Sequence, residues 1–310
     1  MTVLLVGGTG HLGPELIRLL AGNGREPRVL TRDPARARAS LGDGLELIAG
    51  DVRDPASLAG PLAGITTVVS AFSGFGDPTG PGTGTIDRDG NLALIRAARL
   101  AGVEHFVLLS VTQASPDHPM ELMRSKYAAE QELKVSGLAW TIIRPALYME
   151  TWLGVAGDPL VQTGRTRVFG RGDNPLNLIS VRDVARFVAL ALVDPGLRGA
   201  TLEIGGPENV SMNQLIATVE RVAGRTGRVD HVPVPALRVM SVLLRPFRPG
   251  LAGMIGAAVV MDTRDMRFDA SATARHFQSI TPTTLEAAIR QRYAPDRQAS
   301  RAASNEGSPA

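Results

Sequence analysis

Residues 3–13 read Val3-Leu4-Leu5-Val6-Gly7-Gly8-Thr9-Gly10-His11-Leu12-Gly13, an apolar run followed by regularly spaced glycines. Its four apolar residues predict a buried strand. The segment that follows, residues 15–21, carries leucine and isoleucine at helical spacing and predicts a helix that stops near Gly22. The glycines at positions 7, 10 and 13 therefore lie in the turn between a strand and a helix.

Each of these glycines has a physical reason in a phosphate-binding turn. Gly7 permits the tight turn, Gly10 lets the backbone approach a pyrophosphate, and Gly13 lets the helix pack close to the sheet. The N-terminus of the helix presents free N–H groups to the phosphates. We therefore predict that this loop binds a dinucleotide. The residues expected to line the site are Gly7, Thr9, Gly10, His11, Leu12 and Gly13.

The rest of the first half alternates between apolar runs and helical patterns. Further strands are predicted at residues 28–31, 45–49, 67–70, 106–110 and 140–143, with helices at residues 91–101 and 125–136. Strands joined by crossover helices predict an α/β protein with a doubly wound, parallel Rossmann sheet. We assign residues 1–150 to this dinucleotide-binding domain.

The alternation loosens after Pro145. Short strands are predicted at residues 168–169, 177–180 and 201–204, and helices at residues 181–193 and 211–223, the second with Ser211 as its N-cap. We predict a smaller, mostly helical substrate-binding region over residues 151–295 that partly returns to the Rossmann sheet. Residues 296–310 are small and polar, which predicts a disordered tail.

The composition excludes several classes of protein. The 310 residues include no cysteine, and no histidine–carboxylate cluster has metal-ligand spacing, so we expect no metal site. The net charge is only +3 at a sequence pI of 9.8, and no dense basic block occurs, so we expect no nucleic-acid partner. The first residues lack the basic region of a signal peptide, and arginine and proline interrupt the apolar residues 236–261. We expect a cytoplasmic monomer or homodimer with no membrane partner.

Several motifs together resemble one superfamily. The spacing Gly-x-x-Gly-x-x-Gly resembles the turn of the short-chain dehydrogenases/reductases, particularly their extended and atypical branches. Gly50-Asp51-Val52 is similar to their adenine-contacting turn, and Gly90-Asn91 with Ala101-Gly102-Val103 is similar to their fourth helix and fifth strand. Thr141-Ile142-Ile143-Arg144-Pro145 and Gly205-Gly206-Pro207-Glu208 resemble the NmrA-like and quinone-reductase-like members. The resemblance covers residues 1–235 and implies that Asp51 and Val52 contact the cofactor.

Arg32 is the candidate for selecting the cofactor. In the resembling family an acidic residue just after the second strand favours NAD, whereas an arginine accommodates the 2′-phosphate of NADP. Arg32 occupies this position, and a guanidinium suits a phosphate through charge-assisted hydrogen bonds. Asp33 could instead bond a ribose hydroxyl or neutralise Arg32, and Arg32 could be a solvated surface residue. We predict NADP as the cofactor, with NAD as the open alternative.

The active-site pattern departs from that family. Most of its reductases carry Tyr-x-x-x-Lys; Lys126 matches the lysine, but Leu122 stands where the proton-donating tyrosine would be. The resemblance implies that Lys126 contacts cofactor or substrate, and the alternative is a solvated lysine paired with Glu130. Ser110 ends the fifth strand, where the family usually has its catalytic serine or threonine. Tyr148 follows the sixth strand and is either a replacement acid or a packing residue.

The edge of the sheet supplies further candidates for cofactor contact. Doubly wound sheets bind ligands at the carboxyl ends of their strands. Ala71, Phe72 and Ser73 follow the fourth strand and are expected to border the cofactor. Pro145 follows the sixth strand and is expected to pass the nicotinamide.

We predict an NAD(P)H-dependent oxidoreductase that transfers hydride to a quinone or another apolar or aromatic carbonyl compound. A quinone suits a site without Tyr-x-x-x-Lys because its reduced oxygens are stabilised anions. One alternative is an NmrA-like regulator that senses the dinucleotide without turnover. Another is a tailoring enzyme that reduces, rearranges or hydroxylates a polycyclic aromatic secondary metabolite. The apolar runs in residues 236–261 are expected to cover the carboxyl edge of the sheet near Tyr148.

Overall fold

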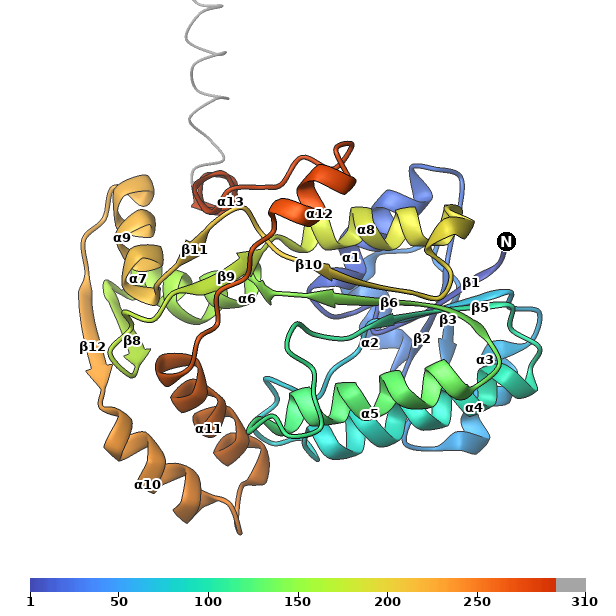
Figure 1. The fold of residues 1–310 in the computed structure, drawn as a ribbon, viewed down its shortest axis with the longest axis horizontal. Helices are drawn as coiled ribbons and strands as arrows, with labels where there is room; N and C mark the ends of the chain where they lie inside the picture. Colours follow the sequence, from blue (N-terminus) through green and yellow to red (C-terminus); the bar gives the residue numbers. More distant parts are fainter. Residues whose placement is uncertain (294–310) are drawn as a thin grey trace, which may run out of the picture.

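The structure, a computed structural model, describes residues 1–293. The predicted tail over residues 296–310 lies outside the described residues. Seven parallel strands form the central sheet in the order β10-β6-β5-β4-β1-β2-β3 (Figure 1). Their bounds are β1 (Val3–Val6), β2 (Arg28–Thr31), β3 (Leu47–Ala49), β4 (Thr67–Ser70), β5 (His105–Leu109), β6 (Ala139–Pro145) and β10 (Ala200–Ile204).

The strand order reverses between β1 and β4. From β1 the chain runs outward through β2 and β3, and then returns to the other side of β1 for β4, β5 and β6. Ligands of doubly wound sheets bind in the crevice outside the carboxyl ends of the strands at such a reversal. The loops after β1 and β4 therefore define the expected site, and the doubly wound α/β fold predicted from the sequence is confirmed.

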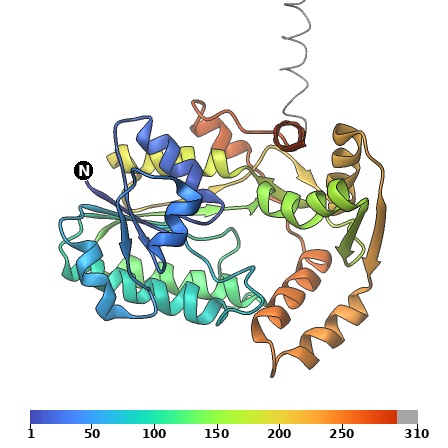
Figure 2. The same cartoon turned by 180° about the vertical axis from the view of Figure 1, so that it is seen from behind.

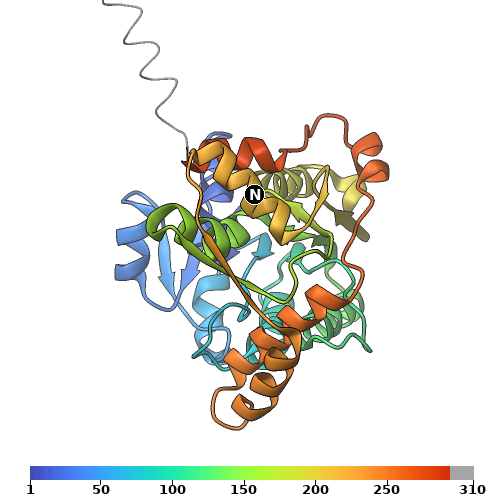
Figure 3. The ribbon, with the colours of Figure 1, turned by 90° about the vertical axis from the view of Figure 1, so that its left-hand side faces the viewer.

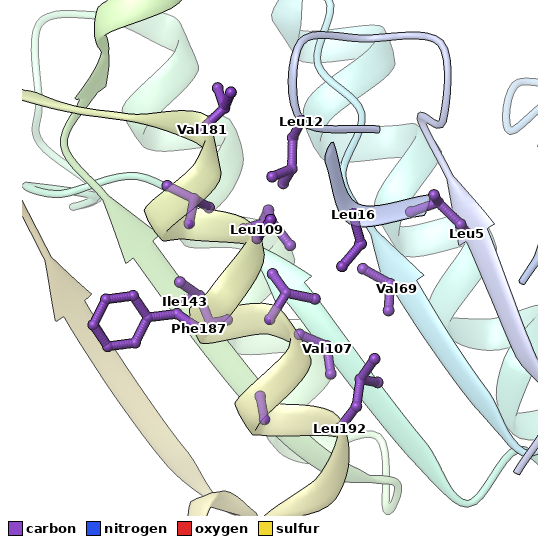
Figure 4. Packing of buried hydrophobic residues seen from close by; sticks show 14 of the residues in the cluster. Leu5, Leu12, Leu16, Val69, Val107, Leu109, Ile143, Val181, Phe187 and Leu192 are labelled. Carbon is purple, nitrogen blue, oxygen red and sulfur yellow. The ribbon is translucent and has the colours of Figure 1, made fainter. Parts of the chain in front are cut away.

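Helices cover both faces of the sheet. One face packs against α1 (Leu12–Ala21) and α8 (Val181–Val193), and the other against α3 (Ala59–Leu62), α4 (Asn91–Leu100) and α5 (Glu121–Val135), as Figure 2 shows. The side chains of β1 alternate accordingly: Leu5 faces the first core, drawn in Figure 4, and Leu4 faces the second. The central strands β1, β4 and β5 are buried on both faces, which explains their largely apolar sequences, whereas the edge strands β3 and β10 are partly exposed.

Local signals in the sequence set the ends of several helices. Gly102 and Gly137, at φ of +74° and +84°, follow α4 and α5 as predicted, because glycine adopts this backbone conformation without steric penalty. The helix α9 (Met212–Ala223) begins with the predicted N-cap: Ser211 and Gln214 form a reciprocal capping box. The remaining elements of the first half are α2 (Pro34–Leu41), η1 (Pro55–Leu58) and η2 (Gly84–Gly90).

The second half adds helices and two small sheets to the central one. Strands β11 (Asn209–Val210), β9 (Leu176–Ile179) and β7 (Leu147–Tyr148) form one sheet, and β12 (Arg228–Val232) pairs with β8 (Arg165–Phe169) in the other. Strand β10 completes the central sheet beside β6. The other elements are α6 (Met149–Trp152), η3 (Leu153–Gly157), α7 (Asp158–Thr163), η4 (Pro195–Leu197), α10 (Val234–Leu244), α11 (Pro249–Thr263), α12 (Ser271–His276) and α13 (Leu285–Tyr293).

Candidate active site

The loop between β1 and α1 lies directly against the end of β4. Gly7 has a φ of +98°, and a Cβ there would lie 2.6 Å from the carbonyl carbon of Ala71. A Cβ on Gly13 would lie 1.9 Å from the carbonyl oxygen of Gly8, so α1 starts in contact with the loop. The backbone itself therefore requires glycine at positions 7 and 13.

Gly10 is exposed and has no such internal reason to be glycine. A Cβ on Gly10 would meet only the carbonyl oxygen of Gly7, at 3.4 Å, and its φ is not positive. A ligand that approaches the backbone closely would supply the missing reason. The cradle at the start of α1 thus fits a pyrophosphate.

The other loop residues differ in what they can offer a ligand. Thr9 and His11 are exposed, and His11 makes no side-chain capping bond to α1. Leu12 is buried in the first core, so only its backbone N–H, which has no partner within the helix, is available to a phosphate.

Arg32 is exposed at the end of β2 and, within residues 1–293, forms no salt bridge. The carboxylate of Asp33 accepts the backbone N–H of Arg36 at 3.0 Å and caps α2. Asp33 therefore does not neutralise Arg32. The guanidinium at position 32 is available to an anionic ligand.

The loop after β3 carries Asp51 and Val52, which the resemblance predicts to contact the cofactor. Asp51 bonds Arg53 through Oδ2 and Nη2 at 2.5 Å, and this hydrogen bond lowers the pKa of the Asp51 carboxyl below its ordinary range. The Val52 side chain packs against Gly90, where an added Cβ would lie 2.8 Å from it. Val52 and Phe72 both pack against the second core, so these two predicted contact residues lie on the same side of the sheet.

Lys126 is buried rather than solvated. Its Nζ lies 3.0 Å from Oδ1 of Asp87 and donates to the carbonyl oxygen of Phe72 at 3.0 Å. Asp87 also accepts the backbone N–H of Gly74 at 2.9 Å. The alternative pairing of Lys126 with Glu130 is wrong. The carbonyl oxygen of Phe72 takes one of the three donors of the ammonium. The contact with Asp87 is a charge contact in which Oδ1 accepts no hydrogen bond, so at least one donor remains for a ligand.

Two buried hydrogen bonds connect β4 to η2, the segment that contains Asp87. Ser70 donates from Oγ to Oδ1 of Asn91 at 2.6 Å, and Nδ2 of Asn91 donates to the carbonyl oxygen of Asp87 at 2.7 Å. The segment that contains Asp87, η2, is a π-helix that runs into α4. Irregular π turns of this kind often mark functional sites. The bonds hold η2 against the carboxyl end of β4.

Ser110 is held by a buried ion pair. Its hydroxyl donates to the carboxylate of Glu130, which is completely buried. The same carboxylate accepts hydrogen bonds from Nη2 and Nε of Arg144 at 2.6 and 2.8 Å. The hydrogen bonds that Arg144 donates to Glu130 raise the pKa of its guanidinium further above the ordinary value. The Ser110 proton is thus committed to Glu130, and its oxygen can only accept from a ligand.

Tyr148 and Pro145 lie where β6 ends. Pro145 is buried, and its carbonyl oxygen accepts the N–H of Thr112 at 3.0 Å. Tyr148 packs against the first core, and burial raises the pKa of its phenol well above the ordinary value. A higher pKa makes this phenol a weaker acid. The catalytic roles of Tyr148, Ser110 and Lys126 stay predictions.

An apolar cluster lies between α11 and the carboxyl edge of the sheet. Ala257 of α11 is buried there with Val111, which follows β5, and with Met123 of α5. The rest of the cluster, which we call the α11 cluster, consists of Ala114, Met120, Phe75, Leu122, Tyr127 and Val260. The predicted cover over the carboxyl edge is therefore present, but α11 forms it; Tyr148 belongs to the first core instead.

No cluster of metal-ligating side chains occurs within residues 1–293, and none of the described helices is long and apolar enough to cross a membrane. The groups gathered at the edge of the sheet are glycine backbone, an ammonium, hydroxyls and apolar side chains.

A family model described as NAD(P)H-binding matches residues 7–195. The chain belongs to this NAD(P)H-binding family. The match confirms the resemblance on which the cofactor prediction rested. It spans the strands of the central sheet from β2 to β6, and it begins at Gly7, directly after β1.

The relatives of this chain include two reductases and an assembly factor. The chain is 31% identical over 252 residues to an NAD(P)H azoreductase of Xenophilus azovorans, covering 81% of both chains. It is 33% identical over 251 residues to a (4-alkanoyl-5-oxo-2,5-dihydrofuran-3-yl)methyl phosphate reductase of Streptomyces griseus, covering 81% of this chain and 83% of the relative. It is 29% identical over 249 residues to the photosystem II assembly factor Ycf39 of Synechocystis, covering 80% and 76%.

A solved structure shares the fold. An NADPH-dependent quinone oxidoreductase of Escherichia coli, solved with NADPH, superposes with a TM-score of 0.74 at 23% identity and covers 94% of this chain and 100% of its own. This likeness supports the fold, including the second half of the chain.

Sequence reasoning missed the partners of the predicted residues. Asp87, Asn91 and Arg144 are far from Lys126 and Ser110 in the sequence, and only the folded chain joins them. The sequence did carry a signal that Lys126 is buried and needs a partner: lysine occurs only at positions 126 and 134 of this arginine-rich chain. A buried lysine needs a carboxylate partner.

Proposed function

We propose that this protein is an NADPH-dependent reductase of a quinone or a similar flat, apolar carbonyl compound. The observation that carries the proposal is the composition of the site beside Lys126. Leu122, at the position of the usual acid, is part of the α11 cluster, so the site pairs a fixed ammonium with an apolar surface. An acceptor that needs orientation more than protonation suits such a surface.

In this proposal, different residues of the chain bind the cofactor and cover the acceptor. Gly10 and the start of α1 hold the pyrophosphate, Arg32 holds the 2′-phosphate, and the third donor of Lys126 holds a ribose hydroxyl. The bound dinucleotide supplies a hydride. Residues 1–150 bind the cofactor, while α11 from the second region covers the acceptor and excludes water. A quinone that takes up the hydride becomes a hydroquinone anion, which gains its proton from solvent when it leaves the covered site.

The preference for NADPH rests on Arg32 and Asp33. An acidic residue that bonds the ribose would favour NADH. The Asp33 carboxylate caps α2 through Oδ1, which leaves only part of its acceptor capacity for a ribose hydroxyl. The exposed Arg32 instead suits a phosphate. The NADPH in the structural neighbour supports the same choice.

The test is oxidation of NADPH, followed at 340 nm, with 1,4-benzoquinone, 1,4-naphthoquinone and its 2-methyl derivative menadione as acceptors. We expect turnover with NADPH, weaker use of NADH, and loss of turnover in Gly10→Val. Binding of NADPH with no oxidation by any acceptor would overturn the reductase proposal.

That result would favour the second candidate, a dinucleotide-sensing regulator. The structural observation in its favour is the same absence of a tyrosine at position 122, together with the weak acidity of Tyr148. A sensor needs the phosphate loop and the Lys126 contact but no acceptor site. Substitutions in the α11 cluster would then leave every measurable property except stability unchanged.

A further inference from the structure

Helix α10 presents an unpartnered apolar face to solvent. One side of the helix carries Val239, Val242 and Leu243, which are spaced as positions i, i+3 and i+4. Their exposed fractions are 58%, 71% and 65%. Phe247, in the turn that follows, is 82% exposed. We call these four residues the α10 patch. Leu237, on the opposite side of α10, is fully buried and shows that the helix already has its inner contact.

Within its own segment of the chain, the α10 patch is flanked only by positive charge. From another element, the loop that carries the exposed Asp77 lies against Gly250 at the start of α11. Residues 231–261 contain no aspartate or glutamate, and their charged residues are Arg238, Arg245 and Arg248. Arg238 and Arg245 are seven residues apart and therefore lie on the same side of the helix. All three arginines are exposed, and within residues 1–293 none of them forms a salt bridge.

We propose that α10 and the turn after it bind the surface of an anionic lipid bilayer. Exposed apolar side chains beside arginines, without acidic residues, are typical of helices that lie in the interface of a membrane. The apolar side chains enter the acyl boundary, and the arginines lie at the level of the anionic headgroups. None of the described helices can span the bilayer, so the contact is peripheral.

The charge distribution favours a bilayer over a second copy of the chain. Two α10 patches facing each other about a two-fold axis would bring six arginines together with no acidic residue of residues 231–261 between them, and like charges across an interface are costly. An anionic bilayer provides both an apolar layer and negative headgroups in one plane.

The position of α10 leaves the patch accessible. The α10–α11 hairpin extends away from the central sheet, and α10 packs against α11, as Figures 1 and 3 show. The inner helix of this hairpin, α11, contributes Ala257 and Val260 to the apolar cluster at the edge of the sheet. A membrane-bound α10 would place that edge near the bilayer surface. This binding does not depend on the proposed reductase activity.

The test is sedimentation of the full chain with sucrose-loaded vesicles. We expect binding to vesicles of phosphatidylcholine with about 30% phosphatidylglycerol and weaker binding to pure phosphatidylcholine. Salt should weaken the binding to the anionic vesicles and leave the binding to pure phosphatidylcholine nearly unchanged. The triple variant Arg238→Gln/Arg245→Gln/Arg248→Gln should lose roughly 100-fold in binding to anionic vesicles. The variant Val242→Ser/Leu243→Ser/Phe247→Ser should lose binding to both kinds of vesicle.

Matched controls distinguish the patch from general properties of the surface. Leu100 and Val135 are 83% and 82% exposed on α4 and α5, so Leu100→Ser/Val135→Ser removes apolar surface elsewhere. The variant Arg25→Gln/Arg99→Gln/Arg275→Gln removes the same charge from other exposed positions. Both controls should bind like the wild type, and unchanged NADPH affinity should show that all variants are folded.

Two outcomes overturn the inference. One is an absence of binding to anionic vesicles by the folded wild type. The other is equal loss of binding in patch and control variants. If ultracentrifugation then shows a dimer that the serine variant dissociates, the patch is an interface between two copies. If the wild type is monomeric, an acidic protein is the remaining class of partner.

Discussion

Lys126 and Asp87 form an ion pair that is almost completely removed from solvent: Nζ lies 3.0 Å from Oδ1, and the side chains are 5% and 0% exposed. The pair joins α5 to η2 at the carboxyl edge of the sheet. Removing one member of a buried pair leaves the other charge uncompensated, whereas removing both charges is much less costly. This asymmetry separates the structural role of the pair from a role in cofactor binding.

We expect Asp87→Asn to lower the free energy of unfolding by about 3–5 kcal/mol, because Lys126 then has no buried counter-charge. The asparagine still offers an acceptor to the N–H of Gly74. The double variant Asp87→Asn/Lys126→Met should recover most of this stability in urea unfolding. It should not recover NADPH affinity, because the donor to the ribose is absent. Recovery of both properties would leave Lys126 with a purely structural role.

Arg32→Ala should weaken NADPH binding by roughly tenfold or more and leave NADH binding nearly unchanged, because one charge-assisted contact to the 2′-phosphate contributes about 1.5–3 kcal/mol. Isothermal calorimetry with both cofactors measures the difference. Arg25→Ala, which removes another exposed arginine, is the control. Equal losses for both cofactors would exclude Arg32 from selectivity.

Gly10 and Gly13 should respond differently to a side chain. Gly10→Val should leave a folded protein that no longer binds NADPH, because its Cβ meets only one atom of the chain but fills the cradle. Gly13→Ala should lower the melting temperature itself, because its Cβ would lie 1.9 Å from the carbonyl oxygen of Gly8. Fluorescence titration of NADPH and thermal melts measure both effects. An unchanged titration for Gly10→Val would contradict the phosphate-loop assignment.

Prediction from the sequence succeeded where local signals determine structure. The strands beginning at Val3, Arg28 and Thr67 and the capping of α9 by Ser211 follow from apolar runs and turn residues, and the structure confirms them. The partner of Lys126 could not be predicted, because Asp87 reaches it only through the packing of η2 on α5. Glu130, the helical neighbour that spacing favoured, pairs instead with Arg144 on the adjacent strand. Contacts between distant segments depend on tertiary packing, which a single sequence does not encode in a readable pattern.

Stability should fall in acid because of His105. Burial lowers the pKa of this imidazole to about 4 in the folded protein, from the ordinary value of 6.5. Its Nε2 lies 3.0 Å from Oγ1 of Thr141, whose only hydrogen is donated to the carbonyl oxygen of Leu197. His105 therefore donates from Nε2, and its lowered pKa keeps the imidazole of the folded protein neutral above about pH 4.

The unfolded chain takes up a proton on His105 below pH 6.5, whereas the folded chain does so only near pH 4. The free energy of unfolding should thus decrease as pH falls through this interval, by up to about 3 kcal/mol. In His105→Gln, urea unfolding at pH 7, 6, 5 and 4 should show a shallower decrease. His276→Gln, at an exposed histidine, should behave like the wild type. Identical slopes in all three proteins would rule out His105 as the source.

The α11 cluster provides the most direct test of where the acceptor binds. Val260→Thr keeps the shape of the side chain but places a hydroxyl in an apolar surface, which costs about 1–2 kcal/mol when the hydroxyl finds no partner. If an apolar acceptor covers this surface, its KM should rise by roughly 5–30-fold while NADPH affinity stays constant. Val259→Thr is the matched control, because its neighbouring position on α11 lies outside the cluster. Steady-state kinetics with menadione distinguish the two variants, and equal KM values for both would place the acceptor away from α11.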